Sequence, residues 1–531
     1  MPELFSSLLA GNVADIGRIL PECMVVATFL FALVFDMVVG EERRRSTAYI
    51  CVLGLLVAMC LNLEQFRAFT THAASGRVIF AGMMKYDQFG CFFRFLLLLG
   101  TIISLLVAVH ARELAGKNHG EFYLLLVAVC AGGMFLVSST NLLMIYLSIE
   151  SLSVVSYAMA GYLRRDRRSA EAGIKYMVYG AMASGLMIFG MSWLYGLGGT
   201  LNLLDTSIAL GPAVPGADQN QVIHGLASLV TSFEGQYATS RGALVAILAL
   251  VFAGFLYKIA AVPFHYWSPD VYEGSPTTAA GFFSVVPKAA GFAVLIRVIC
   301  AFFPLGSLVG AQTWLGYPRV ETIMTIVAIA SMFIGNLAAL GQTNAKRMLA
   351  YSSIAHAGYM LAGLTVLDNA TGPAAVLFYM AVYLLMNLGA FMVLVAMENV
   401  FGGSDLNHLR GAVRREPVMV VALIIFLFSL TGFPPFGGFI GKYLIMLKLA
   451  DRNHFGMIVI IGFNSVISLY YYMKLAKAVA IDQPEEAIAS TERTPFSYHL
   501  LAVCQSLALL ALFFNFEWLQ NLCKQVVERL H

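Results

Sequence analysis

Charged residues are scarce in this sequence. Asp, Glu, Lys and Arg make up only 12% of its 531 residues, whereas hydrophobic residues make up 59%. The mean hydropathy is +0.79. A soluble globule carries about 25% charged residues, so this composition excludes a soluble protein and predicts a membrane protein. The net charge of +3 is small and the basic residues form no single patch, which excludes nucleic acid as a partner.

Motifs for cofactors and metals are also missing. The eight cysteines are scattered through or beside apolar stretches without a CxxC pair, which excludes a disulfide framework, a zinc site and an iron–sulfur cluster. The sequence has no phosphate-binding glycine loop and no soluble domain, so we expect no cofactor and no metal in this chain. Its first 20 residues include Glu3, Asp15 and Arg18 and lack a continuous apolar core, so they do not form a cleavable signal peptide.

Long apolar stretches take up most of the chain. A transmembrane helix needs about 18 or more mostly apolar residues in a row. Such stretches predict an all-α polytopic membrane protein with about 14 transmembrane helices. They lie near residues 16–39, 48–65, 92–110, 121–138, 140–162, 173–196, 242–264, 276–303, 319–340, 349–366, 373–399, 416–433, 437–473 (part of a broken span and one whole span) and 497–518.

Basic residues recur in every second loop between the predicted spans. By the positive-inside rule these loops are cytoplasmic, so both termini are expected on the exterior side. The longest exterior loop is 200–241, in which Arg241 is the only basic residue. The residues that set this orientation are Arg43, Arg44, Arg45, Arg112, Lys117, Arg164, Arg165, Arg167, Arg168, Lys346, Arg347, Arg410, Arg414, Arg415, Lys474, Lys477 and Arg493.

Two spans are interrupted in their interiors. Span 7 contains Pro263, and span 12 contains "TGFPPFGGFIGK" at 431–442. Proline removes a backbone donor and glycine is flexible, so both places predict non-helical backbone at membrane depth. Such backbone is tolerated only where it is buried in protein or lines a hydrated cavity.

The two breaks lie five spans apart, as in transporters built from inverted repeats. "KYM" at 175–177 lies opposite "FYM" at 378–380, and "YLSIES" at 146–151 lies opposite "YSSIAH" at 351–356. We therefore expect four parts: helices 1–3 in residues 1–120, a first antiporter-like repeat of helices 4–8 in 121–303, a second, inverted repeat of helices 9–13 in 304–478, and helix 14 with the tail in 479–531.

Titratable residues inside the predicted spans are the candidate functional groups. A charge buried in a span costs at least about 2.5 to 3.5 kcal/mol, so it requires a partner or a hydrated cavity. Four such residues are central and two are less so. The central ones are Glu150 (span 5), Lys258 (span 7), Lys288 (span 8) and Lys442 (span 12), and the others are Lys175 (span 6) and His356 (span 10).

These residues allow a structural and a functional interpretation. Structurally, Lys175 snorkels to the surface, His356 is a satisfied core histidine, and Glu150 and Lys258 form an ion pair. Lys288 and Lys442 have no acidic residue within reach in their own spans. A desolvated amine loses stability as a cation and can exchange a proton near physiological pH. A series of such amines across a membrane indicates a proton relay.

Three segments carry a family resemblance. "FLYKIAAVPFHYWSPDVYEGSP", "NAKRMLAYSSIAHAGYMLAG" and "GFPPFGGFIGKYLIM" together resemble the antiporter-like proton-pumping subunits of bacterial NADH:quinone oxidoreductase, respiratory complex I. The resemblance runs from about span 4 to span 13 and is greatest to the subunit N branch, the counterpart of mitochondrial subunit 2.

The resemblance implies a fold, a site and an activity. It implies 14 helices with two inverted five-helix repeats, broken helices 7 and 12, and a proton relay through Glu150, Lys258, Lys288 and Lys442. The sister subunit M has a glutamate where this chain has Lys442. The sister subunit L continues into a long lateral helix, whereas this sequence stops at His531. Both differences favour the subunit N branch.

The predicted function is that of a membrane-arm subunit in a proton-translocating NADH:quinone oxidoreductase, an enzyme complex of the translocase class. The resemblance implies that partner subunits bind NADH, FMN, the iron–sulfur clusters and the quinone. It also implies a bacterial inner membrane, with the lipid bilayer, protons and other membrane-arm subunits as partners. The alternatives are a subunit of a Mrp-type cation/proton antiporter, of a membrane-bound hydrogenase or of a photosynthetic-type dehydrogenase, and a structural scaffold.

Overall fold

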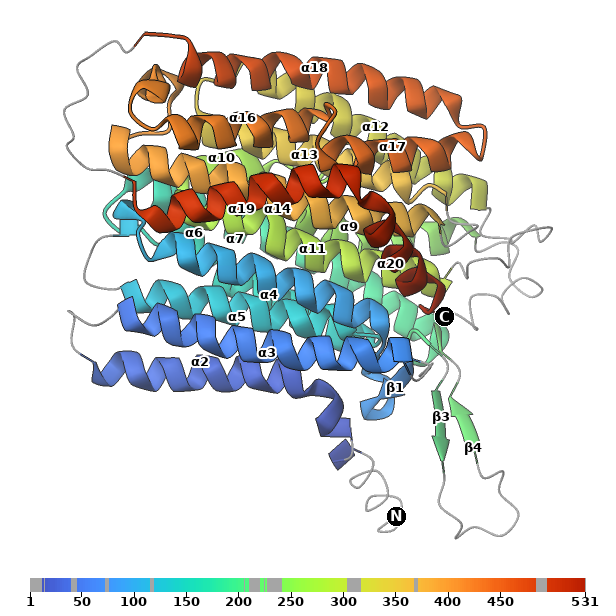
Figure 1. Cartoon of the computed structure of the whole chain (residues 1–531). Coiled ribbons are helices and arrows are strands. Elements are labelled where there is room, and N and C mark those ends of the chain that lie inside the picture. Colours follow the sequence, from blue (N-terminus) through green and yellow to red (C-terminus); the bar gives the residue numbers. More distant parts are fainter. Residues whose placement is uncertain are drawn as a thin grey trace.

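Long α-helices that lie side by side make up nearly all of the described chain (Figure 1). The computed structural model describes residues 12–13, 15–39, 45–71, 76–114, 119–204, 206–209, 220–223, 225–226, 241–302, 317–366, 371–483 and 494–530. Most of the predicted exterior loop 200–241 lies outside the described residues, as do Arg43, Arg44, Lys117 and Arg493.

The described helices follow one another along the chain. They are α2 (Leu20–Val38), α3 (Arg45–Thr71), α4 (Gln88–Ala108), α5 (His119–Ser138), α6 (Leu142–Ala160), α7 (Arg167–Gly198), α9 (Arg241–Ile259), α10 (Trp267–Gly274), α11 (Thr277–Phe302), α12 (Tyr317–Leu340), α13 (Ala345–Gly363), α14 (Thr371–Phe401), α15 (Leu406–Leu409), α16 (Pro417–Thr431), α17 (Gly437–Ala450), α18 (Phe455–Ala480), α19 (Phe496–Phe514) and α20 (Phe516–Glu528). Short 3-10 turns occur at η1 (Gly17–Ile19), η3 (Phe80–Gly82), η4 (Arg112–Leu114) and η6 (Ala412–Arg414).

Two small antiparallel hairpins lie at the end of the bundle where α20 lies (Figure 1). One pairs β1 (Arg77–Ile79) with β2 (Met84–Tyr86). The other pairs β3 (Thr206–Ala209) with β4 (Asn220–Ile223). The first hairpin follows α3 and the second follows α7. Both hairpins therefore lie at one end of the bundle and do not interrupt its helical core.

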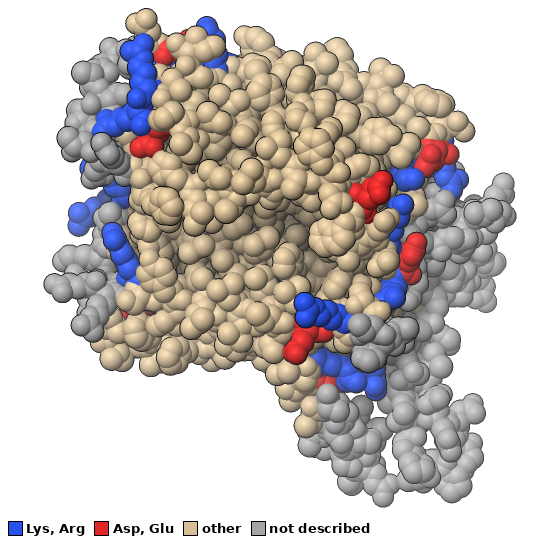
Figure 2. All heavy atoms as spheres, viewed as in Figure 1, with Lys and Arg blue, Asp and Glu red and all other residues tan. Residues whose placement is uncertain are grey.

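The prediction of an all-α multi-pass membrane protein is confirmed. Within the described ranges, 11 helices are long and apolar enough to cross a membrane. Figure 2 shows the matching surface, on which charged side chains gather at two opposite ends and leave an apolar band between them. The predicted number of 14 spans is larger because α9 and α16 are shorter apolar pieces and α13 carries several polar residues.

Helices α11 and α14 form the centre of the bundle. Every residue of α11 is buried, and α14 packs against α11, α13, α16, α17, α19 and α20. Because α11 is buried along its whole length, a charged residue on it is enclosed by neighbouring helices. The sequence places Lys288 at the middle of this helix.

The predicted breaks at spans 7 and 12 are both present. Helix α9 ends at Ile259, where Ala260 adopts a positive φ of 57°, and α10 starts at Trp267. Helix α16 ends at Thr431 and is followed by Gly432, which has a φ of 85° that favours glycine. Helix α17 then begins so close to α16 that a Cβ on Gly438 would lie 1.9 Å from the Ser429 carbonyl oxygen.

Two local structures match each other at the starts of α6 and α13. Asn141 pairs with Asn202 in an isolated antiparallel bridge, and Asn344 pairs with Asp405 in the same way. Each asparagine caps its helix and donates to the side chain of its bridge partner, at 2.6 Å and 3.0 Å. The same offset of 203 residues separates the two asparagines and their two partners.

Candidate functional site

Three lysines lie deep inside the bundle. Lys258 on α9, Lys288 on α11 and Lys442 on α17 are 3%, 1% and 3% exposed. Each amine donates hydrogen bonds to uncharged oxygens, and none of the three forms an ion pair within the part of the chain that the structure describes. Because no buried carboxylate would be left unpaired, each of these amines can lose a proton at a lower electrostatic cost than an ion-paired one.

Lys258 is held by helix α6. Its Nζ donates to Ser153 Oγ at 2.9 Å, and Ser153 lies three residues after Glu150, which makes the two neighbours on the helix surface. Glu150 Oε1 is buried without a hydrogen-bond partner. Lys258 therefore contacts a residue one helical turn from Glu150, its predicted partner. The contact of the amine is Ser153 and not Glu150 itself.

Lys288 contacts helix α13. Its Nζ donates to the Ser353 carbonyl oxygen at 2.8 Å and also to Ser353 Oγ. Pro287 precedes it inside α11 and supplies no backbone N–H, so α11 lacks one helical hydrogen bond beside the lysine. The missing bond would run to the Phe283 carbonyl oxygen, one turn earlier, and the amine itself is bonded to the two oxygens of Ser353.

Lys442 reaches back across the break between α16 and α17. Its Nζ donates to the carbonyl oxygen of Thr431, the last residue of α16, at 2.8 Å, and to Ser465 Oγ at 3.1 Å. Lys258 likewise lies in the last turn of its half-helix α9. Cations are stabilised near helix C-termini by the helix dipole and the free carbonyls, so the breaks provide the stabilisation that carboxylates would otherwise supply.

Helix α13 connects the surroundings of Lys288 and Lys442. Ser353 contacts Lys288, and the ring of Tyr359 lies 4.3 Å from Lys442 Nζ. His356 lies between them, three residues from each, and about 9 Å of helix separates the two ends.

The imidazole of His356 is enclosed by hydroxyl groups. Its Nδ1 and Nε2 hydrogen-bond to Tyr379 Oη at 2.7 Å and Tyr472 Oη at 3.2 Å. Tyr472 also hydrogen-bonds to Ser352. A neutral imidazole donates through one nitrogen and accepts through the other, so this arrangement can pass a proton between hydroxyl partners.

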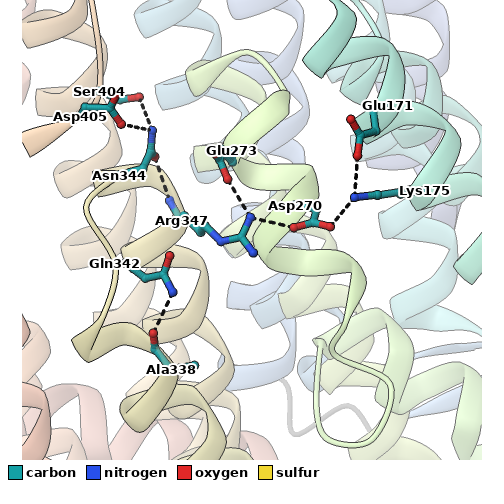
Figure 3. Close-up of polar contacts among 10 residues, drawn as sticks. All are labelled: Glu171, Lys175, Asp270, Glu273, Ala338, Gln342, Asn344, Arg347, Ser404 and Asp405. Atoms are coloured by element: carbon teal, nitrogen blue, oxygen red, sulfur yellow. Dashed lines mark hydrogen bonds and ion pairs between the residues drawn. The ribbon is translucent and has the colours of Figure 1, made fainter.

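Lys175 lies apart from this buried line. It is 37% exposed and forms ion pairs with Glu171 at 2.7 Å and Asp270 at 2.6 Å. Asp270 also pairs with Arg347 at 2.8 Å, which pairs in turn with Glu273. Figure 3 shows these side chains converging from α7, α10 and α13. The cluster ties the second piece of the broken span to two neighbouring helices.

Two fully buried ion pairs were not predicted from the sequence. Arg94 on α4 pairs with Glu22 on α2 at 2.6 Å, and Arg297 on α11 pairs with Asp87 at 2.8 Å. The signal was present, because Glu22, Arg94 and Arg297 interrupt apolar runs as the lysines do.

Lys85 lies outside the helices, near the Asp87–Arg297 pair. Burial lowers the pKa of the Lys85 amine, against the opposing effect of Asp87. Its Nζ donates to the Leu530 carbonyl oxygen, so the C-terminal segment is bound to this group. No cluster of His, Cys, Asp and Glu suited to a metal ion occurs in the described part of the chain.

A multi-pass helical bundle with broken helices and unpaired buried lysines defines a membrane protein of the antiporter type. Residues 139–468 match the family described as "NADH:quinone oxidoreductase/Mrp antiporter, TM". The chain belongs to this family, which confirms the predicted resemblance.

Curated relatives narrow the position within the family. "NADH-quinone oxidoreductase subunit N" of Anaeromyxobacter sp. (strain Fw109-5) is 38% identical over 528 residues, which cover 97% of both chains. Subunit N of Chlorobium chlorochromatii (strain CaD3) is 38% identical and covers 96% of this chain and 94% of its own. "NAD(P)H-quinone oxidoreductase subunit 2" of Gloeothece citriformis (strain PCC 7424) is 36% identical, with 92% and 88% covered.

Solved structures agree with this assignment. A chain of respiratory complex I from Thermus thermophilus with bound aureothin is 28% identical, with a TM-score of 0.71 over 94% of this chain and 99% of that one. A chain of the Mrp complex from Dietzia sp. DQ12-45-1b has a TM-score of 0.78, with 97% of both chains covered, but is only 19% identical. The second likeness shows a shared fold.

Proposed function

We propose that this chain is the subunit N type membrane subunit of a proton-translocating NADH:quinone oxidoreductase, and that it carries protons across the membrane. The observation that supports this most is the set of three buried lysines, each bonded to neutral oxygens. Charges this deep are costly, and a purely structural role would favour ion pairs like those of Arg94 and Arg297. Partner subunits bind NADH, FMN, the iron–sulfur clusters and the quinone.

The relay begins at Glu150 and Lys258. When the Glu150 carboxylate approaches, Lys258 is held protonated, and when it withdraws the proton is released more easily. The arrangement around Ser153, with a free Glu150 oxygen, fits the separated state. Switching between the two states requires only a change of side-chain conformation across one helical turn.

Lys288 then holds the central proton and Lys442 passes it toward the exterior. The contacts of α13 support this order, because Ser353, His356 and Tyr359 lead from one lysine to the other. His356 and its tyrosine partners serve as the intermediate carrier. Lys175 takes part at the cytoplasmic end, and its ion pairs with Glu171 and with Asp270 of the broken span support this role.

The proposed division of the chain into repeats rests on the two equivalent β-bridges, Asn141–Asn202 and Asn344–Asp405. Residues 121–303 and 304–478 form two inverted repeats, flanked by 1–120 and 479–531. The offset of 203 residues between the bridges at Asn141 and Asn344 supports this, and "KYM" and "FYM" have the same offset. The second short match, at 146–151, differs from this register by two residues. Each repeat contains five membrane crossings, an odd number, so the second copy is inverted.

The proposed orientation places both termini on the periplasmic side of a bacterial inner membrane. The ends of α7 and α13 that carry the Lys175 and Arg347 cluster then face the cytoplasm. The hairpins and α20 face the exterior. Fourteen membrane crossings, with α9–α10 and α16–α17 counted as broken spans, fit this arrangement.

Purification with native partners tests the proposal. The tagged chain, extracted in mild detergent, should copurify with subunits that contain flavin and iron–sulfur clusters, and the preparation should oxidise NADH with a quinone as acceptor. Copurification with cation-antiporter subunits that lack redox groups would contradict it and establish the Mrp-type alternative. A preparation containing hydrogenase or photosynthetic-type subunits would contradict it as well.

A further inference from the structure

The ring of Tyr359 is a direct contact of Lys442. Lys442 Nζ lies 4.3 Å from the ring centroid, and Tyr359 is only 1% exposed. An ammonium over an aromatic face is attracted by the negative face of the ring, most strongly where water is excluded. The neutral amine lacks this attraction, so the contact distinguishes the two protonation states.

A network of amides fixes the position of that ring. Asn336 Nδ2 on α12 donates to Tyr359 Oη at 3.1 Å and to Asn464 Oδ1 on α18 at 3.1 Å. Asn336 Oδ1 accepts from Tyr471 Oη at 3.0 Å. Both N–H groups and the oxygen of Asn336 are thus occupied, and all four residues are buried. A satisfied buried network of this kind holds one geometry.

From this geometry we propose that Tyr359 stabilises the protonated form of Lys442, and that Asn336 positions Tyr359 to do so. Tyr359 and Asn336 would thereby set the pH range over which Lys442 exchanges its proton. This deepens the proposed relay and rests on it. Tyr359 and Asn336 are positioning residues, since neither has to carry the proton.

Other titratable groups around Lys442 are few. The helices packed against α17 are α13, α14, α16, α18 and α19, and α16 has no titratable residue. The groups that face this region are His356 on α13, Tyr379 on α14 and Tyr472 on α18, with Lys288 beyond His356. The titratable residues of α19 have other surroundings, since Tyr498 bonds to the Val107 carbonyl oxygen, His499 pairs with Glu416 and Cys504 is exposed. Among these described helices, Tyr359 supplies the aromatic ring that lies over the Lys442 amine.

The test compares two substitutions of the same residue in membranes that contain the assembled complex. Tyr359→Leu removes the ring, so the protonated amine is less favoured and the alkaline limb of proton translocation should move to lower pH by about one unit. Tyr359→Phe keeps the ring but loses the hydroxyl that Asn336 holds, so it should shift this limb no further than Asn336→Leu does and clearly less than Tyr359→Leu. Asn336→Leu releases the ring and should shift the limb in the same direction as Tyr359→Leu, by less.

A control separates this effect from a loss of packing. Tyr498 is fully buried on α19 and bonds to a backbone carbonyl, so Tyr498→Leu should lower stability without moving the pH profile. Superimposable profiles for Tyr359→Leu and wild type, or equal shifts in Tyr359→Leu and Tyr359→Phe, would overturn the proposal. Lys442→Met in the same membranes tests the relay separately, because full translocation by that variant contradicts the proposed function itself.

Discussion

At the scale of single residues, this chain uses arginine and lysine differently. Arg94 and Arg297 are buried in ion pairs with Glu22 and Asp87, and arginine effectively never loses its proton in a protein. The buried lysines instead contact hydroxyl and carbonyl oxygens. Lysine changes protonation readily when it is buried. This difference fits the proposed function, in which the arginines are permanent structural charges and the lysines gain and lose protons.

The first prediction concerns Glu150 and Lys258. Glu150→Gln and Lys258→Met should each reduce proton translocation through this subunit by about a hundredfold or more, as expected for loss of a group that transfers protons. The double variant should lose less than the sum of the two free-energy changes, because interacting residues are not additive. Translocation coupled to NADH oxidation, measured in vesicles with equal amounts of assembled complex, provides the comparison.

Additive losses in that double variant would indicate that the carboxylate and the amine never approach each other. Ser153→Ala is a useful companion variant, because it removes the present contact of Lys258 and leaves both titratable groups in place.

At the scale of helices, the sequence predicts the breaks well and the contacts poorly. Pro263 and "TGFPPFGG" are local signals, since proline and glycine act on their own backbone. The contacts of Lys258 with Ser153 and of Lys442 with Tyr359 join residues about 100 or 80 positions apart. Serines at 153 and 353 look like any other small residue in a span, so only the packed structure identifies them.

A second prediction concerns the junction of α16 and α17. Gly438→Ala would place a Cβ 1.9 Å from the Ser429 backbone oxygen, so the two half-helices would have to separate. We expect a loss of about 3 kcal/mol in stability, measured as a lower thermal unfolding temperature in detergent, together with weaker proton translocation because Lys442 loses its contact with Thr431.

Gly462→Ala in α18 is the matched control. A Cβ there meets nothing within 4 Å, and alanine is favoured over glycine in a helix by up to about 1 kcal/mol. Equal unfolding temperatures for the two alanine variants would show that the close approach of α16 and α17 is unimportant for the fold.

At the scale of the whole molecule, the composition indicates the class of protein, and the charges of the loops predict its orientation in the membrane. The apolar band in Figure 2 follows from the low charge content. The arrangement of helices across that band, including α11 at its centre, depends on long-range packing and could not be predicted from hydropathy. The pairing of Arg94 and Arg297 could not be predicted for the same reason, because each needs a partner from a distant part of the chain.

A third prediction tests orientation. Reporter domains fused after Arg168 and near Asn220 should lie on opposite sides of the membrane, the first in the cytoplasm and the second outside, because basic loops are retained inside. Activity of a cytoplasmic and a periplasmic reporter at each site gives the measurement. Both sites on one side of the membrane would contradict the orientation and the number of spans between the reporters.

The central claim is that the buried lysines carry protons, and substitution by arginine tests it most directly. Arginine keeps the positive charge but does not deprotonate. The relay therefore predicts that Lys288→Arg and Lys442→Arg block proton translocation almost as completely as Lys288→Met and Lys442→Met. Lys442→Glu should retain part of it, because a carboxylate also exchanges protons. The measurement is NADH-driven proton uptake by vesicles in which blotting confirms assembly. Assembled Lys288→Arg and Lys442→Arg complexes that pump at wild-type rates would show that these amines are structural cations and not proton carriers.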